Sequence, residues 1–178
     1  MIPANIDYHR PGSIDAALAL LTEHGEAARV VAGGHSLIPM MKLRMAEVPH
    51  LVDLRAIDAL RGISVTQDRI RLGALVTQAE IVADAGLAAA APILRETALQ
   101  IADPQVRNMG TIGGNVANGE PGNDMPAVMQ ALDARFILQG PSGTREIAAR
   151  EFYEAAYTTA REEDEILTTL DDQPRLVV

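Results

Sequence analysis

The sequence predicts an α+β protein of two lobes, and three observations lead to this prediction. In the first part of the chain, short apolar runs rich in β-branched residues alternate with segments of helical periodicity. In the second part, two hairpin patterns dominate. Two glycine-paired segments, residues 30–36 and 110–115, lie far apart in the chain, and each combines adjacent glycines with β-branched neighbours.

The glycine pairs give the first indication of function. A backbone without Cβ atoms allows close approach to a ligand. Successive N–H groups in such a turn can converge on an anion and hold phosphate oxygens. Because two such turns occur in one small protein, we interpret them as two halves of a diphosphate site that lies between the lobes.

The first lobe is expected to cover residues 1–56. Ser13 is a typical N-cap, and apolar residues then recur at helical spacing as far as Gly25. The remaining elements expected in this lobe are a short strand at 29–32, a helix beginning near residue 37 with Pro39 close to its start, and a strand at 51–54.

The second lobe is expected to cover residues 57–170, and a tail follows at 171–178. It opens with a hairpin over residues 63–72. Thr77 and Glu80 then have the spacing of a capping box. The later elements are expected to be an alanine-rich helix over 87–101 stopped by Asp103-Pro104, a helix over 127–132 capped by Asp124, a hairpin over 135–148 and a strand at 166–170.

The composition excludes several classes of function. The net charge is −9 and the 15 Lys and Arg residues are scattered, so binding to nucleic acid is not expected. The chain has no cysteine, which excludes disulfides, thiolate zinc sites and a cysteine-ligated iron–sulfur cluster within it. No stretch reaches the length of a membrane-spanning helix, and we expect a cytoplasmic protein.

The spacing of the glycines does not fit a doubly wound dinucleotide fold. That fold places G-x-G-x-x-G directly after the first strand, with an acidic residue about twenty positions later. Neither glycine segment of this chain has that pattern. A diphosphate would instead be held by two separate loops.

Both glycine segments resemble signatures of one family. Residues 32–39, AGGHSLIP, resemble the first flavin-binding signature of the flavoprotein subunits of molybdenum hydroxylases, and residues 104–115, PQVRNMGTIGGN, resemble the second. The carbon monoxide dehydrogenase medium subunit and the FAD domain of xanthine dehydrogenase belong to this family. Segments 124–127 and 164–167 and the opening residues are also similar, so the resemblance covers nearly the whole chain.

The resemblance implies a two-subdomain FAD-binding fold of the PCMH type, with FAD between the subdomains. It implies that residues 32–36 and 111–115 hold the pyrophosphate through backbone amides and the hydroxyls of Ser36 and Thr111. It also implies that Ile101 and Leu167 lie against the cofactor and that Asp124 hydrogen-bonds its polar groups. The candidate cofactor-binding residues are therefore Ala32, Gly33, Gly34, His35, Ser36, Ile101, Thr111, Ile112, Gly113, Gly114, Asn115, Asp124 and Leu167.

The resemblance also implies a function, that of an oxidoreductase subunit. Electrons from a molybdenum cofactor on a large partner subunit would pass through [2Fe-2S] clusters on a small partner to FAD and then to an external acceptor. The family continues for about a hundred further residues, so we expect its C-terminal domain to be missing here. The segment 152–170 is then expected to expose apolar side chains to a partner.

Two other functions stay open. One is a stand-alone flavin reductase of the same wider fold, and the other is a flavin-free fragment that serves only for interaction. The substrate of the complex and its acceptor, whether quinone, NAD or oxygen, cannot be read from this chain.

No catalytic side chain and no metal site are predicted. His9, His24 and His50 do not have the sequence spacing of metal ligands. The basic residues near the glycine segments, Lys42, Arg44 and Arg107, are interpreted as solvated charges.

Overall fold

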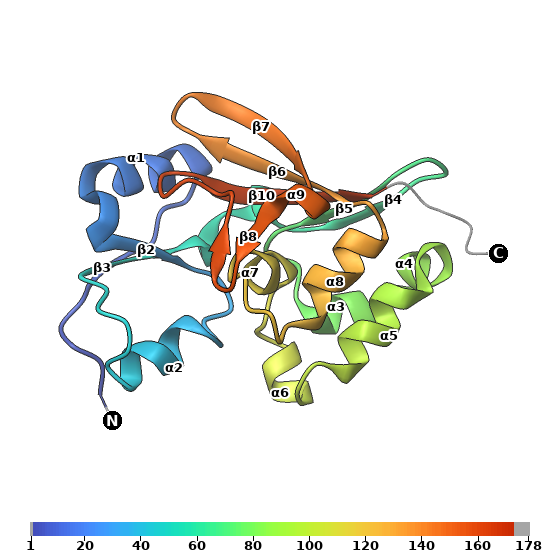
Figure 1. Cartoon of the computed structure of the whole chain (residues 1–178), viewed down its shortest axis with the longest axis horizontal. Helices are drawn as coiled ribbons and strands as arrows, with labels where there is room; N and C mark the ends of the chain where they lie inside the picture. The colour runs from blue at the N-terminus through green and yellow to red at the C-terminus, as the bar shows by residue number, and fades with distance from the viewer. Residues whose placement is uncertain (1, 173–178) are drawn as a thin grey trace.

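A three-stranded parallel sheet forms the first part of the fold in the computed structural model, which describes residues 2–172 (Figure 1). Its strand order is β1-β3-β2, made by β1 (Asp7–His9), β3 (His50–Asp53) and β2 (Ala28–Val31). Strand β1 has no alternating apolar pattern and is not among the predicted elements. It exists because its backbone pairs with β3 in the parallel register Asp7 to His50.

One helix packs on each face of this sheet. Helix α1 (Ile14–His24) buries Ala17, Leu18 and Leu21 against Ala28 and Val52. Helix α2 (Leu37–Lys42) contributes a separate cluster on the opposite face, built from Val31, Met41, Val48 and Leu51. The alternation of side chains along β2 and β3 accounts for the two clusters, because successive residues of a strand point to opposite faces.

The predicted ends of α1 are confirmed. The Ser13 hydroxyl accepts a hydrogen bond from the backbone N–H of Ala16 at 3.2 Å. After the last turn, Gly25 has a φ of 48° and its N–H donates to the carbonyl of Leu21. A positive φ at this position favours glycine, which explains why the helix stops there.

An antiparallel five-stranded sheet forms the second part, in the order β4-β5-β10-β6-β7 (Figure 1). Strand β10, the last one among the described residues, lies in the centre of the sheet, and nearly all of its side chains are buried. Both predicted hairpins and the predicted last strand are confirmed. The strands are β4 (Ile63–Val65), β5 (Ile70–Gly73), β6 (Arg135–Gly140), β7 (Gly143–Ala148) and β10 (Ile166–Asp172).

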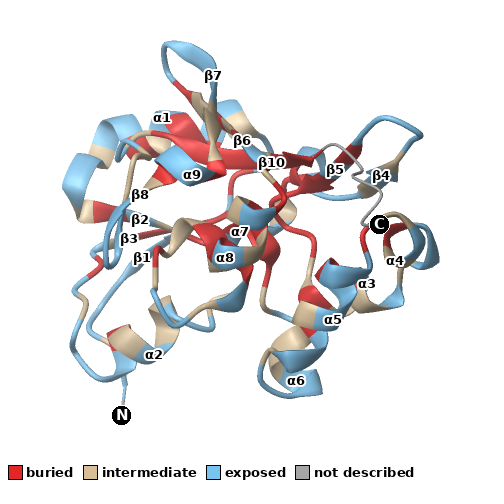
Figure 2. Cartoon of the chain, turned by 45° about the vertical axis from the view of Figure 1, so that its right-hand side comes forward, coloured by how far each residue is buried: buried red, intermediate tan, exposed pale blue. Residues whose placement is uncertain are grey.

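Helices pack against one face of this sheet and enclose the largest buried cluster (Figures 1 and 2). They are α3 (Gln78–Ala83), α4 (Ala85–Ala90), α5 (Pro92–Gln100), α7 (Ile112–Ala117), α8 (Asp124–Ala131) and α9 (Ala149–Phe152). The short helix α6 (Pro104–Arg107) contacts α3 and buries no side chain of its own. The capping box of α3 is present as predicted. The remaining short elements are a ribbon of β8 (Tyr153–Ala155) and β9 (Thr158–Thr159) and the 3-10 turns Gly25–Ala27, Leu54–Ala56 and Asp58–Leu60.

The prediction of one helix over residues 87–101 was wrong. Two helices, α4 and α5, meet at Ala91, because Pro92 has no N–H to continue the first helix and instead occupies the first turn of the second. Asp103-Pro104 ends no long helix. Asp103 caps the N-terminus of α6 by accepting hydrogen bonds from the N–H groups of Gln105 and Val106.

Two predictions around the second glycine segment were also wrong. Residues 112–117 form helix α7 rather than a turn. Asp124 is the first residue of α8 and does not cap it, since Asn123 occupies the N-cap position.

The two lobes share buried side chains. Leu60, Leu75 and Ile166 belong to the same apolar cluster as the inner face of α1. The boundary near residue 56 stays a prediction. Strand β10 extends through Asp171 and Asp172, so these residues belong to the sheet, and positions 173–178 of the predicted tail lie outside the described residues.

The prediction that the segment 152–170 exposes its apolar side chains to a partner was wrong for three of them. Phe152, Ile166 and Leu167 are buried within this chain. Between residues 2 and 172, no helix combines the length and the apolar character needed to cross a membrane.

Candidate functional site

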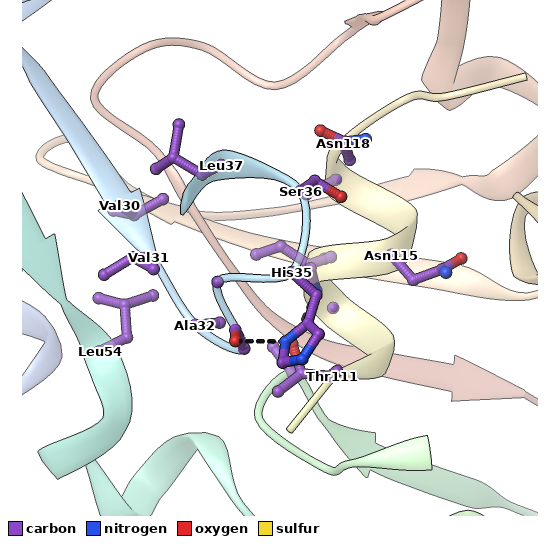
Figure 3. Close-up of a pocket in the computed structure, with 18 of the residues that line it drawn as sticks. Val30, Val31, Ala32, His35, Ser36, Leu37, Leu54, Thr111, Asn115 and Asn118 are labelled. Carbon is purple, nitrogen blue, oxygen red and sulfur yellow. Dashed lines mark hydrogen bonds between the residues drawn. The ribbon is translucent and has the colours of Figure 1, made fainter. Parts of the chain in front are cut away.

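A cavity of about 620 Å³ lies where the two glycine segments meet (Figure 3). Its walls come from β2 and the loop after it, from α7, from the link between α5 and α6, and from the start of β10. A volume of this size is typical of small-molecule sites. Twelve of the thirteen predicted cofactor-binding residues line the cavity, and the exception is Ile112.

The first glycine segment is an open loop between β2 and α2. Gly34 has a φ of 73°, a conformation that favours glycine. Among the described residues, the backbone N–H groups of residues 33–36 have no hydrogen-bond acceptor. These N–H groups are available to an anion, as the sequence predicts.

His35 is held within its own loop. Its Nδ1 atom lies 2.8 Å from the carbonyl oxygen of Gly33, to which it donates when this nitrogen carries the proton (Figure 3). The ring is exposed on the cavity side of the loop. This contact orients the imidazole, and Ser36 stands next to it at the start of α2.

The second glycine segment differs from the prediction, because the amides of residues 112–114 are already occupied. The N–H of Ile112 donates to the Val76 carbonyl at 2.8 Å and that of Gly113 to the Ala74 carbonyl at 3.0 Å. The N–H of Gly114 donates to the Thr111 hydroxyl oxygen at 3.1 Å. These three amides are therefore not free for a pyrophosphate, whereas its binding through the N–H of Thr111 stays a prediction. Ile112 is fully buried in the core.

Thr111 keeps one group for a ligand. Its hydroxyl oxygen caps α7, and the hydroxyl proton is still free to be donated. The segment is held in place by an isolated bridge between Thr111 and Thr77 and by the N–H of Gln78 donating to the Gly110 carbonyl at 2.9 Å. Thr111 thus keeps its predicted place in the cavity wall, whereas the amides of its neighbours Ile112, Gly113 and Gly114 hold the helix in position.

Two buried polar side chains in the cavity wall have atoms without hydrogen-bond partners among the described residues. One, Asn115, is a predicted binding residue, and the other, Gln78, is not. Gln78 is 1% exposed, and neither its amide oxygen nor its amide nitrogen has a hydrogen-bond partner among the described residues. The Oδ1 atom of Asn115 is likewise buried and unpaired there. Buried polar groups are nearly always paired in folded proteins, so these atoms indicate a polar ligand. No sequence signal marks Gln78, since its position inside a capping box suggests only a helix residue.

Apolar side chains form the rest of the wall. Ile101 is half-buried at the end of α5, and Leu167 is buried in β10. The guanidinium of Arg107 donates to the carbonyls of Ile101 and Ala102 at 2.9 and 3.1 Å, which fixes the backbone that carries Ile101. Arg107 is therefore a structural residue and not a solvated charge.

Positive charge comes from two arginines that the sequence analysis did not name, Arg29 and Arg161. Burial, and then repulsion by Arg29, lowers the pKa of the Arg161 guanidinium. Arg161 donates to the carbonyls of Glu162 and Glu165 at 2.6 and 2.9 Å and forms no carboxylate ion pair within residues 2–172. The neighbouring carboxylate of Glu165 is taken by Arg145, which binds both of its oxygens at 2.6 and 2.7 Å.

Asp124 lies on the rim of the cavity and is exposed. Its neighbour Asn123 ties α8 to α7, because the Asn123 amide donates to the Asn115 carbonyl at 3.0 Å. The carboxylate is thus placed at the opening without capping the helix.

Known proteins match this chain along nearly all of its length. A family model described as the FAD binding domain in molybdopterin dehydrogenase matches residues 4–171. The carbon monoxide dehydrogenase medium chain of Afipia carboxidovorans is 58% identical over 170 residues, which are 96% of this chain and 59% of that protein. The xanthine dehydrogenase FAD-binding subunit of Escherichia coli O157:H7 is 30% identical over 169 residues, 94% of this chain and 58% of the relative.

A solved structure has the same fold. Carbon monoxide dehydrogenase from Hydrogenophaga pseudoflava, in a form that lacks the Mo-pyranopterin moiety of the molybdenum cofactor, superposes with a TM-score of 0.97 at 44% identity. The match covers 99% of this chain and 62% of that one. The chain therefore spans about three fifths of the length of the relatives it matches.

Proposed function

The chain belongs to the family of FAD-binding domains of molybdopterin dehydrogenases, and we propose that it binds FAD in the cavity between its glycine segments as the flavoprotein part of an oxidoreductase complex. The observation that carries this proposal is the cavity itself. It combines unpaired amides in residues 33–36 with unpaired side-chain atoms of Gln78 and Asn115. These groups suit a ligand with both an anionic and a polar part.

The residues divide into two sets by chemistry. The N–H groups of residues 33–36 and the hydroxyls of Ser36 and Thr111 are donors for the diphosphate. The cation of Arg161, which lines the cavity close to the start of β10, adds charge complementarity to the diphosphate. Ile101 and Leu167 supply apolar surface for a ring system and keep water away from it.

FAD, when bound, supplies the one- and two-electron chemistry. The residues of this chain position and enclose it. Gln78 offers a donor and an acceptor from a buried side chain, so it can hold a polar edge in one orientation. We assign no side chain to acid–base catalysis, and Asp124 serves as a hydrogen-bond acceptor at the rim.

We further propose that the complex contains a large subunit with the molybdenum cofactor and a small subunit with the [2Fe-2S] clusters. The medium-chain designation of the Afipia relative supports a complex of several subunits. The absence of cysteine from these 178 residues is consistent with clusters carried by another chain. Electrons would then move from the clusters to the flavin held here and on to an external acceptor.

The test is a reconstitution of the complex. This chain is co-expressed with a molybdenum subunit and an iron–sulfur subunit of this family, the flavin is removed, and dye reduction is measured with and without added FAD. Carbon monoxide is the first substrate to try, because of the Afipia relative. We expect FAD to restore electron flow to the external acceptor while molybdenum and iron contents stay constant. Equal electron flow without FAD would contradict the proposed role.

A further inference from the structure

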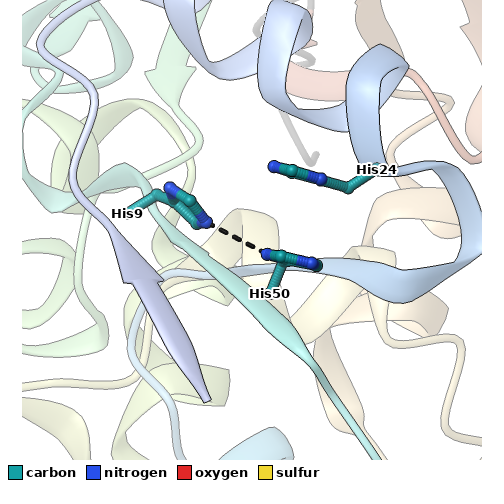
Figure 4. Close-up of side chains that lie close together, drawn as sticks. All are labelled: His9, His24 and His50. Carbon is teal, nitrogen blue, oxygen red and sulfur yellow. Dashed lines mark hydrogen bonds between the residues drawn. The ribbon is translucent and has the colours of Figure 1, made fainter.

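Three of the four histidines of the chain gather at one place outside the cavity (Figure 4). His9, His24 and His50 each offer a ring nitrogen, and these atoms all lie within 4.8 Å of one another. All three side chains are half-buried, and none lines the cavity. The fold thus joins residues whose sequence spacing predicts no metal site.

The parallel pairing of the first sheet brings His9 and His50 together. His50 pairs with Asp7 and His9 with Val52, so the two histidines lie two positions apart on the same face of adjacent strands. Val52 on this face is buried under α1. His24 is the last residue of α1, one turn beyond the buried Leu21, and so it reaches the same face.

The distances between the rings suit a shared cation. The Nε2 atom of His9 and the Nδ1 atom of His50 are 3.3 Å apart. Two nitrogens on a tetrahedral zinc ion, each at about 2.0–2.1 Å, are separated by about 3.3–3.4 Å. The rings of His24 and His50 are stacked with centroids 3.8 Å apart, and one nitrogen of His24 lies within 4.8 Å of a nitrogen in each of the other two rings.

A carboxylate stands beside the cluster. The Oδ2 atom of Asp7 lies 3.8 Å from the Nδ1 atom of His50, and its side chain is exposed. Asp7 is therefore within reach as a fourth ligand, and the open side is also accessible to water. Three imidazoles with one oxygen ligand form a donor set that zinc and neighbouring late first-row metals accept.

We propose that His9, His24 and His50 bind one divalent transition-metal ion of the zinc class, with Asp7 or water as the fourth ligand. Bound in this way, the ion links β1, β3 and the end of α1, which are also joined by the three-residue pairing of β1 with β3, the hydrogen bond from Tyr8 to Asp53 and apolar contacts. His50 is the first residue of β3 and pairs with Ala28, the first residue of β2. The glycine loop, residues 32–36, follows the last residue of β2. The ion therefore stabilises the sheet from which the glycine loop extends and has no part in electron transfer.

The test uses the full chain without metal and titrates it with Zn²⁺ and with Co²⁺. We expect one ion per chain, and for Co²⁺ the strong visible absorption of a tetrahedral site. At a zinc concentration of one hundred times the Kd, the melting temperature should rise by about 5–10 °C. Mg²⁺, which prefers oxygen ligands, should cause neither change.

Two variants and a matched control locate the site. His24→Gln, at the end of a helix, and His9→Gln should each weaken Zn²⁺ binding by at least about tenfold. His35→Gln removes the fourth histidine, which lies in the glycine loop, and should leave Zn²⁺ affinity unchanged. Circular dichroism establishes that each variant is folded. A folded chain that binds no Zn²⁺ or Co²⁺ at one equivalent, or a His24→Gln chain with unchanged affinity, would overturn the proposal.

Discussion

Gly33 lies directly against the carbonyl group of Met109, so that a Cβ atom added to Gly33 would stand 2.2 Å from the Met109 oxygen. Gly113 has a similar relation to the backbone of Ala74, where an added Cβ would lie 2.6 Å from the carbonyl oxygen. At both positions, glycine allows two segments of the protein to touch. Gly33 thus lets the two glycine segments touch, and Gly113 lets α7 pack against the backbone that follows β5. The sequence suggested only the close approach of a ligand.

Replacing Gly33 by alanine should therefore destabilise the fold. The added methyl group meets backbone atoms that cannot rotate away, and we expect a loss of about 1–3 kcal/mol in the free energy of unfolding. Gly12→Ala is the control, because an added Cβ there meets nothing within 4 Å. Urea unfolding of both variants measures the difference. Equal unfolding free energies for Gly33→Ala and Gly12→Ala would contradict the close contact between Gly33 and the Met109 carbonyl.

Thr111 should affect stability and cofactor binding through one hydroxyl. Its oxygen caps α7, so Thr111→Val should cost about 0.5–2 kcal/mol of unfolding free energy. The same variant removes a proposed donor to the diphosphate and should weaken FAD binding. Thr111→Ser keeps the hydroxyl and is expected to retain most of both properties in urea unfolding and flavin titration. A valine variant as stable as the serine variant would argue against the cap.

The pair of Asp53 and Arg55 should make stability depend on pH in the acid range. Burial alone would raise the pKa of Asp53, but hydrogen bonds from Arg55 and from Tyr8 outweigh it and lower the pKa from 3.8 to about 2. The Asp53 carboxyl has a higher pKa in the unfolded chain than in the folded one, so the unfolded chain binds its proton first as the pH falls. The contribution of ionised Asp53 to the free energy of unfolding is therefore complete above about pH 4–5 and is lost as the pH falls toward about 2.

The variant Asp53→Asn measures this contribution. The difference in unfolding free energy between the unchanged chain and this variant should be about 1–2 kcal/mol near pH 7 and should shrink between about pH 4 and 2. Asp58→Asn, which alters an exposed carboxylate 3.8 Å from Arg61, should show almost no difference at any pH. If the difference in unfolding free energy between the unchanged chain and Asp53→Asn stays constant down to pH 2, the lowered pKa of Asp53 is contradicted.

Arg161 should matter for FAD binding through its charge. Arg161→Gln is expected to weaken FAD binding by at least about tenfold at low salt, with a smaller effect at high salt because ions screen the attraction. Arg161→Lys keeps the charge and should retain part of the affinity. Arg150→Gln removes an arginine that pairs with Asp133 on the surface and serves as the control. An unchanged affinity for Arg161→Gln in flavin titrations would exclude the arginine from the site.

Local signals in the sequence were sufficient for many elements. The Ser13 cap, the Thr77 and Glu80 capping box and the two hairpins depend on residues close together in the chain, and all of them are confirmed. Helix α7 was missed because two glycines at its start favour a turn, while Thr111 and the carbonyls of Ala74 and Val76 stabilise the helix from outside.

Other features depend on distant segments and have no local signal. Strand β1 exists through its pairing with β3, some forty residues later in the chain. The buried Gln78 reaches the cavity wall because its backbone bonds to Gly110. The histidine cluster likewise needs the register of β1 and β3 and the last turn of α1. These relations are decided by tertiary packing and not by spacing.

The most direct test of the central claim is a titration of the full chain with FAD, carried out in parallel on Gln78→Leu. Leucine removes two buried, unpaired polar atoms, so the variant should be at least as stable as the unchanged chain in urea unfolding. The same change should weaken FAD binding by at least about tenfold, whereas the exposed Gln67→Leu should alter neither property. We predict one FAD per chain, bound with quenched flavin fluorescence and lost selectively in Gln78→Leu. A folded chain that binds no FAD, or that binds it equally well with leucine at position 78, would contradict the account of this cavity.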